Sequence, residues 1–154
     1  MNFLILLLSF VAMELVAWLA HKYVMHGILW SLHRDHHLKD HDHVMERNDF
    51  FFLIFATPGI LLMYFGMKNG GLDPRLWMGL GISLYGLAYV LMHDIFIHQR
   101  IKIFTRTDNF YLRGIRRAHK MHHKHLGKDN GECFGMLWAP PKYLLEAKGS
   151  ARRK

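Results

Sequence analysis

The chain has 154 residues, which is the size of one domain, and we treat residues 1–154 as a single domain. Its net charge is +8 at neutral pH although 51% of its residues are hydrophobic, so apolar and basic stretches must be segregated along the chain. A single cysteine, Cys133, excludes an internal disulfide and a cysteine-based metal site.

Three apolar segments are long enough to cross a bilayer, whose hydrocarbon core of about 30 Å needs about 20 helical residues. They are residues 3–20, 50–67 and 76–97. The first lacks the basic start and small-residue cleavage site of a signal peptide, so we expect a retained helix. Any single segment could be a buried core helix. Three in so short a chain predict an all-α integral membrane bundle with three or four transmembrane helices.

Basic residues are distributed unequally about these spans. Segments 21–49 and 98–154 contain eighteen lysines and arginines, whereas the link between the second and third spans contains only Lys68 and Arg75. The positive-inside rule predicts that the eighteen-residue side is cytoplasmic. A fourth crossing by residues 134–145 is an alternative, but this stretch is short and contains two prolines, which favours a segment lying at the membrane interface.

Ten of the thirteen histidines repeat one spacing twice, H-x4-H followed by H-x2-H-H. On a helix, residues i, i+3 and i+4 share a face, so we expect each H-x2-H-H to aim three imidazoles at one point. An H-x4-H pair lies about 140° apart on an ideal helix and needs a bend, a helix end or two different metals to converge. The ten residues are His21, His26, His33, His36, His37, His93, His98, His119, His122 and His123.

This duplicated pattern predicts a dinuclear metal centre on the cytoplasmic side. Neutral imidazole is the commonest metal ligand, and ten exceed the four ligands of a structural zinc site. A polar cap at the membrane or a solvated basic tail would explain three or four histidines, but not ten in a repeated spacing. Soluble di-iron bundles use Glu-x-x-His motifs, which this sequence lacks. Imidazole alone does not choose among zinc, copper, iron and nickel.

The boxes resemble those of the membrane-bound fatty acid hydroxylase superfamily of non-haem di-iron oxygenases. Within it, further stretches resemble the branch of bacterial β-carotene 3-hydroxylases, and together they span most of the chain. The boxes alone are typical of the whole superfamily, whereas the flanking "MHD…HQR" and "FG-x-LWAPP" point to the carotenoid branch. The matching stretches are "MELVAWLAHKYVMHG" (13–27), "LHRDHH" (32–37), "YGLAYVLMHDIFIHQR" (85–100), "RAHKMHHKHLGK" (117–128) and "FGMLWAPPKY" (134–143).

The resemblance implies O2-dependent hydroxylation of carotenoid β-rings at C3, from β-carotene through β-cryptoxanthin to zeaxanthin. It implies two Fe2+ ions as cofactors, O2 as co-substrate and the ten box histidines as candidate ligands, without assigning each to one iron. The ring C3–H bond is not allylic and needs a strong oxidant, which favours two redox metals over zinc. It also implies an enzyme of the bacterial cytoplasmic (inner) membrane.

The sequence lacks the motifs by which a chain binds its own electron-carrying cofactor. It has no G-x-G-x-x-G fingerprint, haem attachment motif or cysteine cluster. We therefore expect an external electron donor, such as a ferredoxin with its reductase. The basic face could attract an acidic donor, and anionic lipid head groups explain it equally well. The carotenoid substrate would be dissolved in the lipid bilayer, and we expect no nucleic-acid partner.

Two carboxylates are candidates for contacts that support the metal ligands. Asp94 neighbours His93, and metal-bound histidines usually donate their other N–H to a carboxylate or carbonyl; a helix-end charge is the alternative. Glu14 lies inside a span, two turns before His21, where an ionisable residue tends to be functional. It is a candidate to orient a ligand or to lie beside the substrate path, and snorkelling to the interface is the alternative. We expect the histidines outside the boxes to be solvated, with a supporting role left open: His41, His43 and His125.

The third span carries two further features. Gly79, Ser83 and Gly86 form a stripe of small residues, which favours close helix packing. Tyr85 and Tyr89 are candidates to line a substrate channel, although a helix–helix or lipid contact is the simpler expectation for either ring.

Three other classes of function are alternatives to carotenoid hydroxylation. The nearest is another oxygenase of the superfamily, acting on a fatty acyl chain or a sterol, or a carotenoid ketolase acting at C4. A membrane metal transporter or sensor would also use histidines, but it predicts ionisable residues along the spans, and the second span has none. A structural membrane protein does not explain the duplicated boxes.

Overall fold

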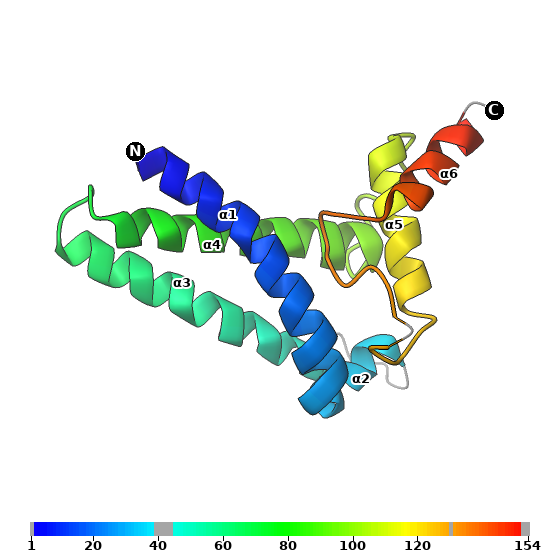
Figure 1. Cartoon of the computed structure of the whole chain (residues 1–154), viewed down its shortest axis with the longest axis horizontal. Coiled ribbons are helices and arrows are strands. Elements are labelled where there is room, and N and C mark those ends of the chain that lie inside the picture. Colours follow the sequence, from blue (N-terminus) through cyan, green and yellow to red (C-terminus); the bar gives the residue numbers. More distant parts are fainter. Residues whose placement is uncertain (1, 39–44, 130, 152–154) are drawn as a thin grey trace.

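A computed structural model describes residues 2–38, 45–129 and 131–151 (Figure 1). Every regular element in these residues is helical, which confirms the expected all-α fold. The elements in chain order are α1 (Asn2–Leu19), the π-helix η1 (Ala20–Ile28), α2 (Trp30–His37), the 3₁₀ turn η2 (Arg47–Asp49), α3 (Phe50–Lys68), α4 (Pro74–Tyr89), the π-helix η3 (Val90–Ile97), α5 (Phe110–His122) and α6 (Pro141–Ala151).

The described chain contains three helical stretches long and apolar enough to cross a membrane, as predicted. They are Asn2–Ile28, Arg47–Lys68 and Pro74–Ile97, so the first extends well past residue 20. No residue of α1 is buried in the protein, and this apolar surface suits contact with hydrocarbon. Residues 134–145 do not add a fourth such stretch: an irregular segment leads into the short α6.

Helix α4 packs against both α1 and α3 through glycines on different faces. A Cβ atom on Gly79 would lie 2.5 Å from the carbonyl oxygen of Gly59, and one on Gly81 would lie 2.5 Å from that of Leu6. The backbones therefore approach too closely for any side chain, as small residues at helix interfaces allow. Of the small residues expected to allow close helix packing, Gly79 lies at such a contact, whereas Gly86 has open space beside it and lines a cavity.

Capping residues define where two of the later helices begin. The Asp73 carboxylate accepts a hydrogen bond from the Arg75 N–H, and Pro74 occupies the first position of α4. The Asn109 side chain accepts from the backbone N–H groups of Tyr111 and Leu112 at the start of α5. These caps satisfy backbone N–H groups that the first turn of each helix leaves unpaired.

A small core holds α5 and α6 against the end of η3, where the third span ends. The Arg116 guanidinium lies 3.9 Å above the Phe96 ring and donates to the carbonyls of Phe96, Phe104 and Thr105, which ties the connection after η3 to α5. This packing places the second H-x2-H-H beside the first. The buried members of the core are Phe96, Ile97, Ile115, Ala118, Cys133, Ala139 and Tyr143.

Candidate metal centre

Each H-x4-H pair lies in or at the end of a π-helix. His21 and His26 lie within η1, and His93 lies within η3, with His98 directly after it. A π-helix closes its backbone bonds from i to i+5, and the His98 N–H donates to the His93 carbonyl at 2.8 Å. Residues five apart therefore lie about one turn apart. The expected bend and helix end are also present, because the backbone kinks at Gly27 directly after His26 and His98 lies at the end of η3.

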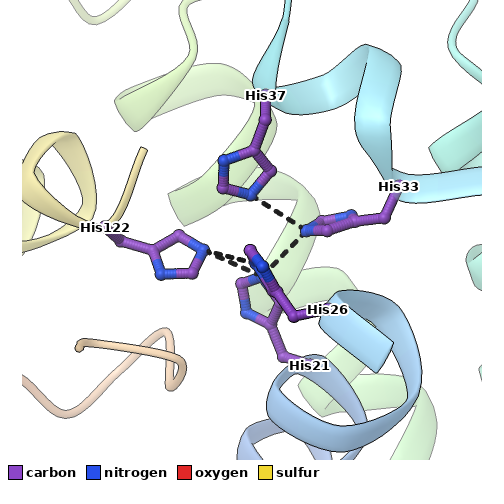
Figure 2. A group of neighbouring side chains, drawn as sticks. All are labelled: His21, His26, His33, His37 and His122. Atoms are coloured by element: carbon purple, nitrogen blue, oxygen red, sulfur yellow. Dashed lines mark hydrogen bonds between the residues drawn. The ribbon is translucent and has the colours of Figure 1, made fainter. Parts of the chain in front are cut away.

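The first group of imidazoles is drawn from η1, α2 and α5 (Figure 2). Its ligand nitrogens all lie within 4.8 Å of one another. The Nε2 atom of His21 lies 3.0 Å from that of His33 and 3.1 Å from that of His122, and the His26 and His122 Nε2 atoms are 3.1 Å apart. The members are His21, His26, His33, His37 and His122.

The second group lies beside the first and is drawn from α2, α5 and the end of the third span. It consists of His36, His93, His98 and His119, again with nitrogens within 4.8 Å of one another. The Nε2 atom of His123 lies 2.9 Å from that of His119, and its ring stacks on His37 of the first group at 4.1 Å. All ten box histidines thus meet at one end of the spans.

The two H-x2-H-H boxes each contribute to both groups, which differs from the expectation of three imidazoles at one point. His33 and His37, four residues apart, share the first group, while His36 belongs to the second. In the later box His119 belongs to the second group and His122 to the first. Successive helical residues are rotated by about 100°, so the central histidine of each box faces away from its neighbour. The crossed arrangement links the two groups.

Burial favours the neutral form of several of these imidazoles. Burial lowers the pKa of His33 to about 3, opposed by its hydrogen bond to Asn48. Burial, reinforced by the surrounding imidazoles, also holds the pKa of His36 and of His119 well below the usual histidine value. Neutral imidazole is the form that binds a metal ion.

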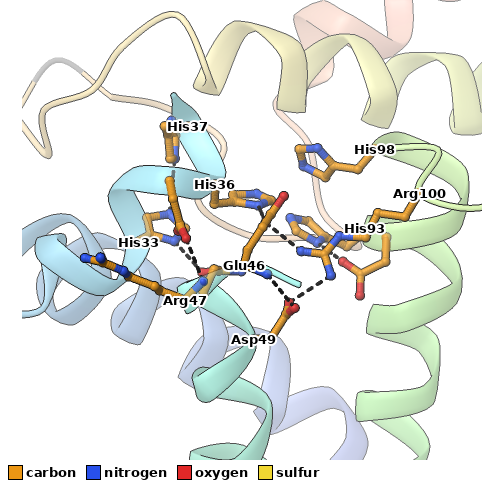
Figure 3. Close-up of polar contacts among 12 residues, drawn as sticks. His33, His36, His37, Glu46, Arg47, Asp49, His93, His98 and Arg100 are labelled. Atoms are coloured by element: carbon orange, nitrogen blue, oxygen red, sulfur yellow. Dashed lines mark hydrogen bonds and ion pairs between the residues drawn. The ribbon is translucent and has the colours of Figure 1, made fainter. Parts of the chain in front are cut away.

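Side-chain acceptors orient three of the rings (Figure 3). The Nδ1 atom of His33 lies 2.6 Å from the Asn48 amide oxygen, and that of His36 lies 2.8 Å from the Glu46 carboxylate. A third acceptor is Asp94, 2.8 Å from the Nδ1 atom of the adjacent His93, at the position expected from the sequence. Glu46 and Asn48 were not predicted; the polar "ERND" before the second span is the only signal that pointed to them.

Backbone carbonyls orient three more rings. The Nδ1 atoms of His21, His26 and His122 lie 2.9–3.0 Å from the carbonyl oxygens of Phe134, Leu126 and Glu132. With the proton on Nδ1, each ring directs the lone pair of Nε2 toward the centre of its group. This tautomer and second contact are typical of metal-bound histidines.

The donor set fits a pair of metal ions. Lone pairs 3.0 Å apart repel one another unless a cation lies between them, and two nitrogens at right angles, each about 2.1 Å from a metal, are about 3.0 Å apart. The Nε2 atom of His36 is buried and has no hydrogen-bond partner within the described chain. Both observations indicate a site shaped for metal, with nitrogen ligands that suit iron, zinc, copper or nickel.

An apolar cavity of about 440 Å³ reaches both groups from the membrane-spanning side. It lies between α1, α3 and α4, and His21, His93 and His119 form part of its wall. Tyr85 and Tyr89 line it, and the Tyr89 ring stacks on His93 at 4.5 Å. The candidate channel tyrosines therefore face the cavity.

Among the described residues, Glu14 and His125 belong to neither imidazole group. Glu14 does not snorkel: its carboxylate accepts hydrogen bonds from the Tyr85 hydroxyl and from backbone N–H groups of residues 136–138. The side chain of His125 is exposed, as expected. His41 and His43 lie outside the described residues.

Comparison with known proteins identifies the family. The model of the fatty acid hydroxylase family matches residues 6–139. The chain is 40% identical over 146 residues to a beta-carotene hydroxylase of Pantoea ananas, covering 95% of this chain and 82% of that protein. It is 38% identical to that of Pseudescherichia vulneris, covering 95% and 81%.

A plant relative shares the same region. The chain is 39% identical over 142 residues to the chloroplastic beta-carotene 3-hydroxylase 1 of Arabidopsis thaliana, covering 91% of this chain and 44% of that protein. No solved structure matches. The family match extends over most of the chain and includes all ten box histidines, so this protein belongs to the fatty acid hydroxylase family.

Proposed function

We propose that this protein hydroxylates carotenoid β-rings at C3 with O2, converting β-carotene to β-cryptoxanthin and then to zeaxanthin. The observation that carries the proposal is an apolar cavity between membrane-spanning helices whose wall includes imidazoles of both metal-binding groups. Relatives about 40% identical over most of the chain are beta-carotene hydroxylases, which supports a carotenoid over an acyl or sterol substrate.

Two iron ions are the proposed cofactors. When bound, they would react with O2 and supply the oxidant that breaks an unactivated ring C–H bond. The five histidines of the first group would hold one ion, and the second group together with His123 would hold the other. The chain's own contribution is to keep these imidazoles neutral, to fix their tautomers through Nδ1 and to present Nε2 to the metal.

The cavity would bind one end of the substrate. Its volume falls within the usual range of about 300–1,000 Å³ for small-molecule sites, and its lining is mostly apolar. A carotenoid dissolved in the bilayer could place one ring there while its polyene lies among the lipid-facing helices. The apolar lining would exclude water from the ring methylene and orient it toward His21, His93 and His119.

We further propose that the metal centre faces the cytoplasm, in the inner membrane of a bacterium. The segments at the histidine end of the spans carry eighteen of the twenty lysines and arginines, which the positive-inside rule places on the cytoplasmic side. Electrons would come from an external donor such as a ferredoxin and its reductase, whose acidic surface would complement this basic face.

Pigment analysis tests the proposal. The chain is expressed in bacteria that accumulate β-carotene, beside the variants His36→Ala, His122→Ala and the exposed-histidine control His125→Ala. We expect β-cryptoxanthin and zeaxanthin from the wild type and the control, and no hydroxylated product from the other two variants, with all four proteins present in the membrane. Chromatography and mass spectrometry identify the products.

Other outcomes would redirect the assignment. Ring ketones would identify a C4 ketolase. Unchanged β-carotene with iron-loaded protein and a supplied ferredoxin system would exclude carotenoid hydroxylation and favour a fatty acyl or sterol substrate. Full activity of both ligand variants would contradict the role given to the histidine groups.

A further inference from the structure

A half-buried carboxylate within the first span, that of Glu14, binds the irregular segment that precedes α6. Oε1 of Glu14 accepts hydrogen bonds from the backbone N–H groups of Met136, Leu137 and Trp138 at 2.9–3.0 Å. Oε2 accepts from the Tyr85 hydroxyl at 2.7 Å and from the Leu137 N–H at 3.2 Å. The partners lie 71 to 124 residues away along the chain, so this side chain connects α1, α4 and the C-terminal part.

The same segment touches the metal centre. It begins at Phe134, whose carbonyl oxygen lies 2.9 Å from Nδ1 of His21 and whose ring packs edge-on against His21 and His122. The next residue is Gly135, where a Cβ atom would lie 2.6 Å from the Glu14 carboxylate. Residues 134–136 also form part of the cavity wall. One short segment therefore meets a metal-ligand candidate and the substrate cavity.

We infer that Glu14 is a positioning residue, which pins segment 134–138 to the first span so that the Phe134 carbonyl holds the His21 ring in its metal-binding tautomer. An effect of Glu14 on hydroxylation rests on the proposed function. The anchoring of segment 134–138 and the orientation of His21 do not depend on it. Glu14 acts through the segment and His21 and has no direct part in the chemistry.

Elementary energetics explain why a charged acceptor is used here. Irregular backbone near hydrocarbon must have its N–H groups satisfied within the protein. Three successive N–H groups converge on one carboxylate, and bonds to a charged acceptor are stronger than neutral ones. A leucine at position 14 would leave these groups without acceptors and free the segment. His21 could then place its proton on either nitrogen, which weakens its binding to metal.

The test uses the full-length protein, purified in detergent, with variants on both sides of the contact. Glu14→Leu removes every acceptor, and Glu14→Gln keeps one side-chain oxygen for the three N–H groups. Gly135→Ala changes the segment itself, because the added methyl group would clash with the Glu14 carboxylate and displace the segment from it. Thr57→Val is the matched control, because Thr57 is a polar residue in another span whose hydroxyl donates to the carbonyl of Leu53 in its own helix.

Two readouts do not depend on catalysis. Hydrogen exchange of residues 136–138 should be at least about tenfold faster in Glu14→Leu and Gly135→Ala, because their N–H groups lose a charged acceptor. Titration of metal-free protein with Co2+, followed by its absorption spectrum, should show about 10- to 100-fold weaker binding and an altered spectrum. Glu14→Gln should fall between Glu14→Leu and the wild type, and Thr57→Val should match the wild type.

The inference is overturned if Glu14→Leu and Gly135→Ala keep wild-type exchange at residues 136–138. It is also overturned if exchange increases while Co2+ affinity and spectrum stay unchanged. If Glu14→Leu does not accumulate in the membrane, hydrogen exchange and Co2+ binding of Gly135→Ala and Glu14→Gln test the inference in its place. Should the wild type fail to hydroxylate β-carotene while these effects appear, the proposed substrate is wrong and the positioning role stands.

Discussion

At the scale of single residues, the metal centre depends on what each imidazole contacts through its outer nitrogen. Glu46 shows this most clearly, because its Oε2 atom lies 2.8 Å from Nδ1 of His36 and 2.5 Å from the Arg100 guanidinium (Figure 3). Arg100 also donates to Asp49 at 2.8 Å. The arginine thus holds the carboxylate in place, and the carboxylate fixes the ring of His36.

Removing this acceptor should weaken metal binding without unfolding the protein. We expect Glu46→Ala to lower iron affinity about 10- to 100-fold, as loss of a contact behind a metal ligand commonly does. Glu146→Ala is the matched control, since Glu146 forms an exposed ion pair with Arg117. Iron content measured over a series of chelator concentrations checks the prediction, and equal retention by both variants would contradict it.

At the scale of elements, the π-helices and the glycine contacts bring the histidines together. The change from α to π geometry at Ala20 and Val90 puts residues five apart on one face, just where each apolar helix reaches its histidines. The close approach of α4 to α3 at Gly79 then fixes how the spans align. The π-helices and the contact between α3 and α4 together determine where the imidazoles lie.

The glycine contacts predict stability changes of opposite sign. Gly79→Ala should destabilise the protein by about 1–3 kcal/mol, because its methyl group would lie 2.5 Å from backbone of α3. Gly86→Ala, with open space at its Cβ position, should leave stability unchanged or raise it by about 0.5–1 kcal/mol. Thermal denaturation in detergent measures both, and equal destabilisation would show that α3 and α4 do not pack as described.

At the scale of the whole molecule, the metal centre joins parts of the chain that are far apart in sequence. The Nε2 atoms of His26 and His122, 96 residues apart, lie 3.1 Å from each other, and those of His98 and His119 lie 2.9 Å apart across the connection to α5. A small apolar core holds α5 and α6 to the end of the third span. Metal bound by both groups would therefore hold the later part of the chain to the first span.

Removal of metal should consequently lower stability. At a free Fe2+ concentration 100 times the dissociation constant, binding to the folded state alone contributes about 2.7 kcal/mol. We expect chelator-treated protein to denature about 5–10 °C lower, with recovery when Fe2+ is restored. Differential scanning fluorimetry measures the midpoints. His36→Ala, which lacks one candidate ligand, should show a smaller shift, and identical midpoints with and without metal would refute the linkage.

The sequence by itself predicted the class of this protein and the candidate residues of its site. Hydrocarbon thickness determines the length of a span, so three apolar stretches in residues 3–97 were enough to predict the membrane helices. The repeated spacing identified all ten box histidines, because imidazole in clusters serves few purposes besides metal binding. Asp94 could be predicted because it is adjacent in sequence to the ring it orients.

Only the tertiary structure decided how the histidines divide between the two groups and what supports them. Ideal α-helical angles place the two histidines of an H-x4-H pair on different faces. The change to a π-helix, which brings them together, adds less than one residue per turn and cannot be recognised from composition. Glu46, Asn48 and the Phe134 carbonyl lie 10, 15 and 113 residues from the rings they contact, and such contacts arise only when distant helices pack. Glu14 was visible as a charge inside a span, but its partners come from two other parts of the chain, which only the fold brings within hydrogen-bonding distance.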